Sequence, residues 1–189
     1  FDPATGGRAY RDRIGIVRAI AGYVHADVVV HGRGDHAGAT PMDFRLDPTT
    51  VLAESTLELE RLARAAGGGT VGTVGEIEVA PGLINAIAEQ VRFSLDIRGP
   101  DEDAFRGVAR EIGAYAKQAA AARGMTAEYR ERQTLPATPM SEAVVDALDV
   151  AASATGEPYR VMVSGAAHDT MCVAPRVRSA MVFVPCRDG

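Results

Sequence analysis

The stretch His31-Gly-Arg-Gly-Asp-His-Ala-Gly-Ala-Thr-Pro-Met-Asp-Phe-Arg-Leu-Asp-Pro48 is a glycine-rich loop between two predicted elements of secondary structure. The β-branched residues of Ala26–Val30 predict a strand just before it. Thr49–Ala66 is predicted to be a helix, with Asp47 placed to cap it and Pro48 at its first position. A rigid strand and a rigid helix therefore hold this loop, which is an arrangement typical of functional loops.

His36 is the one histidine within the central part of this loop, close to the turn pair Thr40-Pro41. The residues themselves leave two interpretations open. In the first, His36 only hydrogen-bonds a neighbouring carbonyl within a tight turn. In the second, the loop presents the imidazole for chemistry at the edge of the sheet.

The order of predicted elements after this loop indicates the fold. Val91, Phe93, Leu95 and Ile97 alternate with polar residues and define the buried face of a strand. From about residue 24 to 133 the order is strand, helix, strand, strand, helix, strand, with predicted bounds 26–33, 49–66, 70–79, 90–97, 101–122 and 125–133. This order is the split βαβ plan of the α+β class, a four-stranded antiparallel sheet with two helices on one face.

The segments on either side of this unit have a different character. Ile14–Ile20 predicts a strand, and the C-terminal part predicts a helix at 141–155 capped by Ser141, strands at 158–163 and 179–184, and a loop at 164–175 that leads into a helix. These hydrophobic strands are typical of part of a larger α/β sheet. We therefore expect residues 1–20 to be a connection, 21–135 to form the inserted domain, and 136–189 to belong to an incomplete second domain.

Composition narrows the class of protein. The chain has 189 residues and a net charge of −5, and its basic residues are scattered, so we expect no nucleic-acid partner. Cys172 and Cys186 lie far apart without a CxxC spacing, which favours a reducing compartment, and we expect the cytoplasm. No apolar run approaches the ~18 residues of a membrane span, so no membrane partner is expected. The chain does not begin with Met, and Phe1–Arg13 is typical of a broken connection, so we expect a fragment.

The loop also resembles a known family signature. His36-Ala-Gly-Ala-Thr-Pro-Met42, followed by Arg45 and Asp47, resembles the motif of the amidase/carbamoylase branch of the M20 metallopeptidase-like family. That branch includes N-carbamoyl-L-amino-acid hydrolases, β-ureidopropionase and allantoate amidohydrolase. Members of the family have an inserted dimerisation or lid domain, which agrees with the split βαβ pattern.

A second stretch, Ser164-Gly-Ala-Ala-His-Asp-Thr-Met171, resembles the family's Ser-Gly-Ala-Gly-His-Asp-Ala motif, with Ala167 in place of a glycine. A backbone N–H contact to substrate tolerates that change, whereas a conformation with positive φ does not. The hydrophobic run that ends in Val184-Pro185, with Asp188-Gly189 after it, fits the family's continuation. The residues alone also permit His168 and Asp169 to be a capping pair at the start of a helix.

A third pair of residues, Asn85 and Arg98, flanks the alternating strand. Taken alone, both are consistent with solvated side chains. Pro81-Gly-Leu-Ile-Asn85 and Asp96-Ile-Arg98 match family positions, and the resemblance implies that Asn85 and Arg98 bind the carboxylate of the substrate. A guanidinium offers a carboxylate two parallel N–H donors, which lysine cannot do.

The resemblance implies a complete mechanism to which this chain contributes only part. His36 is expected to polarise the scissile carbonyl in the partner subunit's site, while an arginine of the same lid, Arg98, holds the acid group. Gly165, Ala167 and His168 are expected to hold the other side of the substrate from the second domain. Closure about hinges near 20–24 and 133–138 is expected to bring the groups together.

Cofactors and partners follow from the same resemblance. The family uses two divalent metal ions, zinc or manganese, cobalt or nickel. The ligand segments are absent from this sequence, so the chain alone is expected to bind none. The partners are a small ureido or carbamoyl amino acid and a second copy of the chain, paired through the lid.

Three hypotheses for function stand at this point. The first is a metal-dependent amidohydrolase that cleaves the carbamoyl or ureido C–N bond of N-carbamoyl amino acids or allantoate. The second is a dimerisation module without catalysis. The third is a peptidase or deacylase of the wider M20 group, which ranks lower because the loop motif continues with Pro41-Met42-Asp43 and Arg45.

Overall fold

The computed structural model describes residues 12–185, which fall into two compact units. Residues 22–136 form one unit, which we call the lid. The described segments before and after it, 12–21 and 137–185, form the other, which we call the flanking unit. The expectations for residues 1–11, for Cys186 and for Asp188-Gly189 lie outside the described residues.

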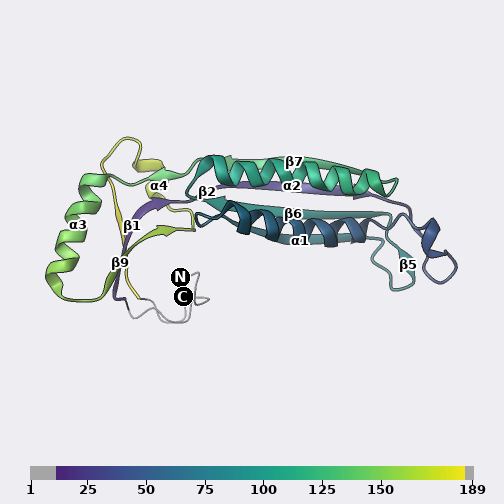
Figure 1. Cartoon of the computed structure of the whole chain (residues 1–189), viewed down its shortest axis with the longest axis horizontal. Coiled ribbons are helices and arrows are strands. Elements are labelled where there is room, and N and C mark those ends of the chain that lie inside the picture. Colours follow the sequence, from purple (N-terminus) through teal and green to yellow (C-terminus); the bar gives the residue numbers. More distant parts are fainter. Residues whose placement is uncertain (1–11, 186–189) are drawn as a thin grey trace. The chain divides into compact units, whose positions relative to one another are not determined.

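The lid is a four-stranded antiparallel sheet with two helices (Figure 1). The strand order is β4-β6-β2-β7, with bounds Val71–Ala80 for β4, Gln90–Gly99 for β6, Gly22–His31 for β2 and Thr126–Leu135 for β7. The helices α1, Pro48–Ala66, and α2, Glu102–Ala122, pack on the sheet through one shared core. The predicted α+β class and the split βαβ order are therefore confirmed.

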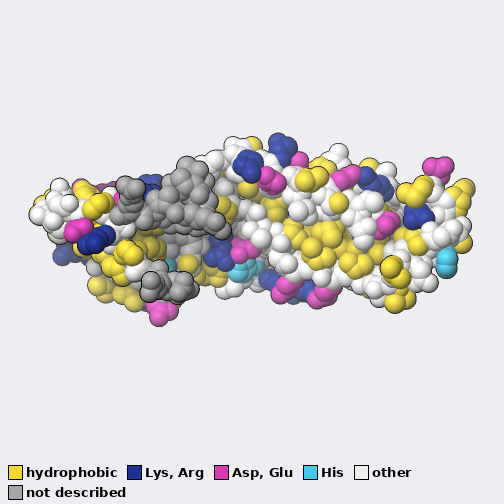
Figure 2. All heavy atoms as spheres, turned by 90° about the horizontal axis from the view of Figure 1, so that it is seen from below, with side chains coloured by type: hydrophobic (Ala, Val, Ile, Leu, Met, Phe, Trp, Pro, Cys, Tyr) yellow, Lys and Arg dark blue, Asp and Glu magenta, His cyan; other side chains and the backbone are white. Residues whose placement is uncertain are grey.

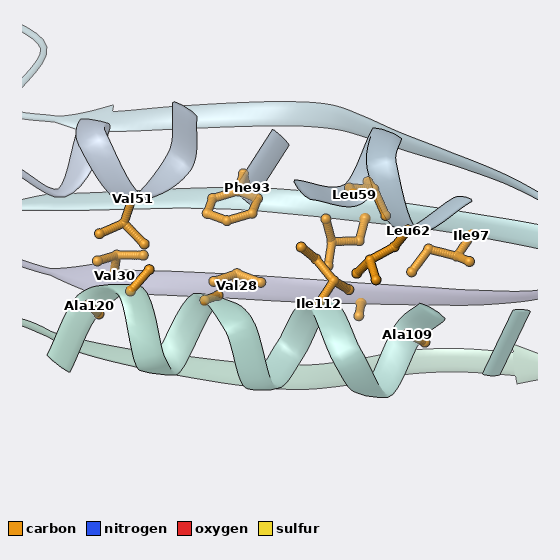
Figure 3. Close-up of a cluster of buried hydrophobic side chains, with 14 of the residues drawn as sticks. Val28, Val30, Val51, Leu59, Leu62, Phe93, Ile97, Ala109, Ile112 and Ala120 are labelled. Carbon is orange, nitrogen blue, oxygen red and sulfur yellow. The ribbon is translucent and has the colours of Figure 1, made fainter. Parts of the chain in front are cut away.

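The core of the lid lies between the helices and the sheet (Figure 3). Alternate residues of β2 and β6 point into it, because successive side chains of a strand face opposite sides. Phe93 and Ile97 of β6 and Ile112 of α2 are almost completely buried. The other members that Figure 3 labels share this core, namely Val28, Val30, Val51, Leu59, Leu62, Ala109 and Ala120.

Aspartates cap both helices of the lid, as predicted for Asp47 but not for Asp101, which was predicted to be the first residue of its helix. The Thr49 amide donates to Oδ1 of Asp47 over 2.9 Å, and Pro48 is the first residue of α1. The Ala104 amide likewise donates to Oδ1 of Asp101 over 3.1 Å at the start of α2. Each side chain satisfies an amide that the helix itself leaves without a partner.

Two strands differ from their predicted forms. Strand β2 begins at Gly22 and not at Ala26, because Gly22 pairs with Gly99 and extends the ladder. Strand β4 shifts its register against β6 between Val74 and Ile77. That irregularity explains why its hydrophobic residues do not keep a strict spacing of two.

The flanking unit is a small mixed sheet with two helices. Strand β1, Ile14–Ile20, pairs in parallel with β9, Tyr159–Ser164, and antiparallel with β10, Met181–Phe183, and β8, Thr138–Pro139. Helix α3 covers Glu142–Thr155 and α4 covers Thr170–Val173. Ser141 occupies the N-cap position of α3 as predicted, but its side chain makes no capping hydrogen bond, so that part of the prediction is wrong.

In the described part of the chain, no helix combines the length and the apolar character needed to cross a membrane.

Candidate functional site

His36 lies at one end of the lid. It belongs to β3, Asp35–His36, which pairs antiparallel with β5, Ala86–Ile87. The Ala37 amide donates to the carbonyl oxygen of Asn85 over 2.9 Å, so the two loops are joined. Both His36 and Asn85 are exposed, and β5 marks this end of the lid in Figure 1. The structure therefore brings His36 and Asn85 together.

The imidazole of His36 has a defined hydrogen-bonding state. Its Nδ1 accepts a hydrogen bond from the Gly38 amide over 3.1 Å. A neutral imidazole has one donor and one acceptor nitrogen, so the proton of the neutral ring lies on Nε2. The ring thus hydrogen-bonds within the turn, but its partner is the Gly38 amide and not a carbonyl. The ring also has an N–H group that it can offer to a ligand.

Arg45 holds the backbone of this loop in place. Its Nη2 donates to the Ala37 carbonyl over 2.5 Å and its Nε donates to the Thr40 carbonyl over 3.1 Å. Sequence reasoning included Arg45 in the family motif but gave it no role. The only available signal was its position at the end of a glycine-rich loop with many carbonyl groups. Arg45 thus acts on His36 indirectly, because it fixes the backbone on the C-terminal side of that residue.

Arg98 lies near the end of β6, opposite Tyr23 of β2. Its Nε and Nη2 donate to the carboxylate of Asp96 over 2.8 and 2.7 Å. Its guanidinium carbon also lies 5.6 Å from the centre of the Tyr23 ring, within the range of a cation–π interaction. Hydrogen bonds to Asp96 raise the pKa of Arg98. The side chain is partly buried, so the interpretation of Arg98 as a merely solvated residue is wrong.

Asp96 and Tyr23 were missed as neighbours of this arginine. Asp96 stands two residues before Arg98, so both face the same side of the sheet, and this spacing was a usable signal. Tyr23 could not be found because its strand was predicted to begin at Ala26. Together these two residues fix the plane of the guanidinium.

His36 and Arg98 lie far apart within one lid. His31 of β2 pairs with Gln90 of β6 near the His36 end, and Tyr23 pairs with Arg98 near the other end. The eight steps along the strand from Gln90 to Arg98 span about 27 Å at the usual rise of ~3.4 Å per residue. A small substrate is shorter than this, so one lid does not place His36 and Arg98 on the same molecule.

The flanking unit holds the second set of predicted residues. Ser164 ends β9, the exposed turn of Gly165 and Ala167 follows, and His168 comes next. The Oγ of Ser164 lies 2.7 Å from Nε2 of His168. Asp169 precedes α4 without any capping bond from its side chain, so the interpretation of His168 and Asp169 as a capping pair is wrong.

The open face of the lid sheet has charged residues that pair with one another. Asp27 makes ion pairs with Arg92 and Arg132, which also contact Glu76. Desolvation of the Asp27 carboxyl raises its pKa. The hydrogen bonds and charges of the two arginines outweigh this and lower the pKa of Asp27 overall. The histidine, cysteine and carboxylate side chains of residues 12–185 form no cluster of three that could hold a metal ion.

The chain is thus a split βαβ unit inserted between two segments of a second, mixed sheet, with an exposed histidine at one end of the inserted unit. Residues 18–123 match the peptidase dimerisation domain of the M20 type. The chain therefore belongs to the M20 family, and the predicted resemblance is confirmed.

Relatives and solved structures agree on the branch of the family. The chain is 39% identical over 176 residues to the N-carbamoyl-L-amino-acid amidohydrolase of Paenarthrobacter aurescens, covering 93% of this chain and 43% of that protein. It is 28% identical to the allantoate amidohydrolase of Escherichia coli, again over 93% and 43%. A hydantoinase/carbamoylase family amidase from Burkholderia ambifaria superposes with a TM-score of 0.90 at 36% identity, over 94% of this chain and 44% of that one. The chain thus spans less than half the length of these relatives.

Proposed function

We propose that this chain is part of a metal-dependent amidohydrolase that cleaves the carbamoyl or ureido C–N bond of N-carbamoyl amino acids or allantoate. The observation that carries the proposal is the loop at the end of the lid, where an exposed imidazole has one ring nitrogen bound internally and the other available as a donor. The names of the relatives support a carbamoyl or ureido substrate, since they hydrolyse such compounds.

In this proposal His36 stabilises the developing oxyanion. The Gly38 amide occupies Nδ1, so Nε2–H can donate to the carbonyl oxygen of the scissile group as negative charge builds on it. Asn85, on the adjoining loop, binds the same end of the substrate. Arg98 binds its carboxylate, and Gly165, Ala167 and His168 contact it from the flanking unit.

Divalent metal ions would supply an activated water molecule in the complete enzyme. The residues described in this chain do not fit such a centre, because no three of their potential ligands lie together. We therefore assign no metal ligand to residues 12–185, and the choice among zinc, manganese, cobalt and nickel stays open. In this proposal the residues of this chain bind the substrate and do not bind the metal ions.

The separation within the lid supports a site shared between subunits. Arg98 serves the site of its own subunit, whereas His36 and Asn85 reach the site of the partner. This arrangement follows because about 27 Å of strand separates the two groups within one lid. A symmetric dimer then has two equivalent sites, each with a complete set of groups.

We assign the dimer contact to the β4 edge of the lid sheet. Val71, Ile77 and Val79 of β4 are 54%, 53% and 41% exposed, which is unusual for hydrophobic residues on an edge strand. Figure 2 shows hydrophobic side chains gathered along the lid. Both edges have exposed charged side chains, such as Glu76 and Glu78 on β4 and Glu128 and Arg130 on β7, but β7 has no exposed large hydrophobic side chain.

The double substitution of Ile77→Lys and Val79→Lys is expected to convert the dimer to a monomer at micromolar concentration. Two added charges repel across a twofold interface and lose the burial of two aliphatic side chains. Light scattering coupled to size-exclusion chromatography measures the mass directly. The matched control, Thr126→Lys with Gln133→Lys on β7, is expected to remain a dimer, and a monomer there with a dimer of the β4 variant would reverse the assignment.

A lid chimera tests the proposed function. Residues 22–136 form a compact unit, so they can replace the corresponding lid of the Paenarthrobacter aurescens relative. We expect this chimera to release amino acid from N-carbamoyl amino acids, and His36→Ala to lower its kcat/KM by about 100- to 1,000-fold, the usual cost of an oxyanion donor. A chimera that folds and dimerises but is indifferent to His36→Ala would contradict the proposal.

The alternative is a chain that only dimerises, which the matched dimerisation domain favours for the chain as given. The two candidates differ in one outcome. A module without a catalytic role would support the activity of the chimera equally well with or without His36. The chain by itself is expected to form dimers and to show no hydrolysis under either candidate.

A further inference from the structure

Ser164 has no role in the proposed function, yet it is one of the few buried polar residues described. It is the last residue of β9 and is only 2% exposed. The Oγ atom lies 3.2 Å from the Ala166 carbonyl, 3.3 Å from the Ala166 amide nitrogen and 2.7 Å from Nε2 of His168. The hydroxyl therefore sits at the centre of the turn that leads to His168.

A serine hydroxyl has a single proton to donate, so these three contacts cannot all be donated. The Ala166 amide donates to Oγ, which leaves two possible acceptors for the hydroxyl proton. The contact with Nε2 is the shorter by half an ångström. Its length of 2.7 Å is typical of a bond donated by a hydroxyl, whereas N–H donors usually stay near ~2.9 Å.

We propose that Ser164 is a positioning residue that holds neutral His168 with its proton on Nδ1, so that His168 presents an N–H donor to an oxygen atom of the ligand. The Nε2 atom of the ring accepts from Ser164 and is occupied. Among residues 12–185, the structure gives Nδ1 of His168 no hydrogen-bond partner. The residue is partly exposed, and its ring contacts the ring of Phe183, with ring centres 5.5 Å apart. This contact restricts rotation of the imidazole.

The two candidate histidines then have opposite tautomers, and each presents one N–H donor to the ligand. His36 accepts at Nδ1 and donates from Nε2, whereas His168 accepts at Nε2 and donates from Nδ1. The identity of this ligand oxygen rests on the proposed function, in which His168 donates to an oxygen atom of a carbamoyl or carboxylate group. Neither ring then has a vacant acceptor nitrogen, so neither serves as the general base of the reaction.

Histidine side-chain NMR on the present chain tests the tautomer without any need for activity. Long-range ¹H–¹⁵N correlation spectra at neutral pH distinguish a protonated ring nitrogen from an unprotonated one. We expect the proton of His168 on Nδ1 and that of His36 on Nε2 in the same spectrum. Ser164→Ala is expected to shift His168 towards the Nε2–H form and to leave His36 unchanged.

Ser179→Ala is the matched control, because its hydroxyl donates to the Val177 carbonyl over 2.8 Å in the same unit and does not contact His168. It is expected to leave the His168 signals in place. A wild-type spectrum with His168 protonated on Nε2 overturns the proposal, whether or not the variants fold. That result would leave the lid chimera and its His36 dependence untouched.

A second measurement addresses the donor role in an active enzyme. A chimera that contains the whole matched stretch of this chain is compared with its His168→Asn and His168→Gln variants. An asparagine amide lies near the position of Nδ1 and a glutamine amide near that of Nε2. We expect His168→Asn to keep KM within about threefold and His168→Gln to raise it by about tenfold or more, and the reverse order would refute a donor at Nδ1.

Discussion

Mixing a His36→Ala subunit with an Arg98→Ala subunit of the lid chimera is expected to restore about a quarter of the unmodified rate, since half of randomly formed dimers are mixed and each has one intact site of two. Each variant alone is expected to lose about 100-fold or more in kcat/KM. Such a recovery of activity from two inactive variants is a large effect, and it is not expected if His36 and Arg98 serve the same site from the same subunit.

The recovery follows from where the two residues lie in the sheet. His36 is joined to β5 at the Gln90 end of β6, whereas Arg98 pairs with Tyr23 about 27 Å away along the strand. A site that uses both groups must take them from different lids. In a mixed dimer, the subunit with an intact Arg98 receives an intact His36 from its partner, and the other site lacks both.

The matched control is a mixture of His36→Ala with Asn85→Ala. These residues lie on loops joined by the hydrogen bond from Ala37 to the Asn85 carbonyl, so they enter the same site from the same lid. No mixed dimer then has a complete site, and we expect no recovery. Equal recovery from both mixtures, or none from either, would contradict the shared site. Co-expression with two affinity tags isolates the mixed dimers, for which the expected rate rises from about a quarter to about half of the unmodified rate.

Gly32→Ala is expected to destabilise the lid by about 3 kcal/mol, towards the upper end for overpacking in a rigid environment. A β-carbon at this position would lie 2.1 Å from the Leu46 carbonyl oxygen and 2.6 Å from Cδ of Pro48. Neither atom can rotate away, because one belongs to the backbone and the other to a proline ring. The same Leu46 carbonyl accepts from the Arg33 amide over 2.9 Å, so the base of the His36 loop would open.

Gly34→Ala is the matched control two residues further along the loop. Its β-carbon would lie 3.2 Å from Cβ of Glu89, a contact that a shift of a few tenths of an ångström relieves, and the Ile87 carbonyl oxygen lies 3.7 Å away. We expect a change below about 1 kcal/mol. Urea unfolding with hydrogen exchange at the amides of β2 measures both variants in the intact chain. Equal midpoints for the two variants would show that the close approach at Gly32 is unimportant.

The sequence was sufficient for the lid because its local patterns agree with one another. Alternation in Val91–Ile97, the cap at Asp47 and the order of the predicted elements all favour one βαββαβ order, and the structure has it. The start of β2 was missed because Ala21-Gly22-Tyr23 has no alternation. Only the pairing of Gly22 with Gly99 extends the strand, and pairing is a tertiary property.

The candidate site was less accessible to prediction. His36, Asn85, Arg98 and His168 were selected by resemblance, and their roles remain proposals. Their separation became visible only once the register of β2 against β6 was known, because sequence distance does not give distance across a sheet. The partners Ser164 and Arg45 were hidden for a similar reason. Their hydrogen bonds depend on turn geometry, which no periodic pattern encodes.

Strands β2 and β7 are neighbours, and Tyr23 at the beginning of the lid pairs with Leu135 at its end. The polypeptide therefore enters and leaves this unit at adjacent points. A gene segment that encodes such a unit can be spliced into a host enzyme, or exchanged between hosts, without opening a gap in either. Exchange of this unit as a whole therefore leaves the chain on either side of it joined as before.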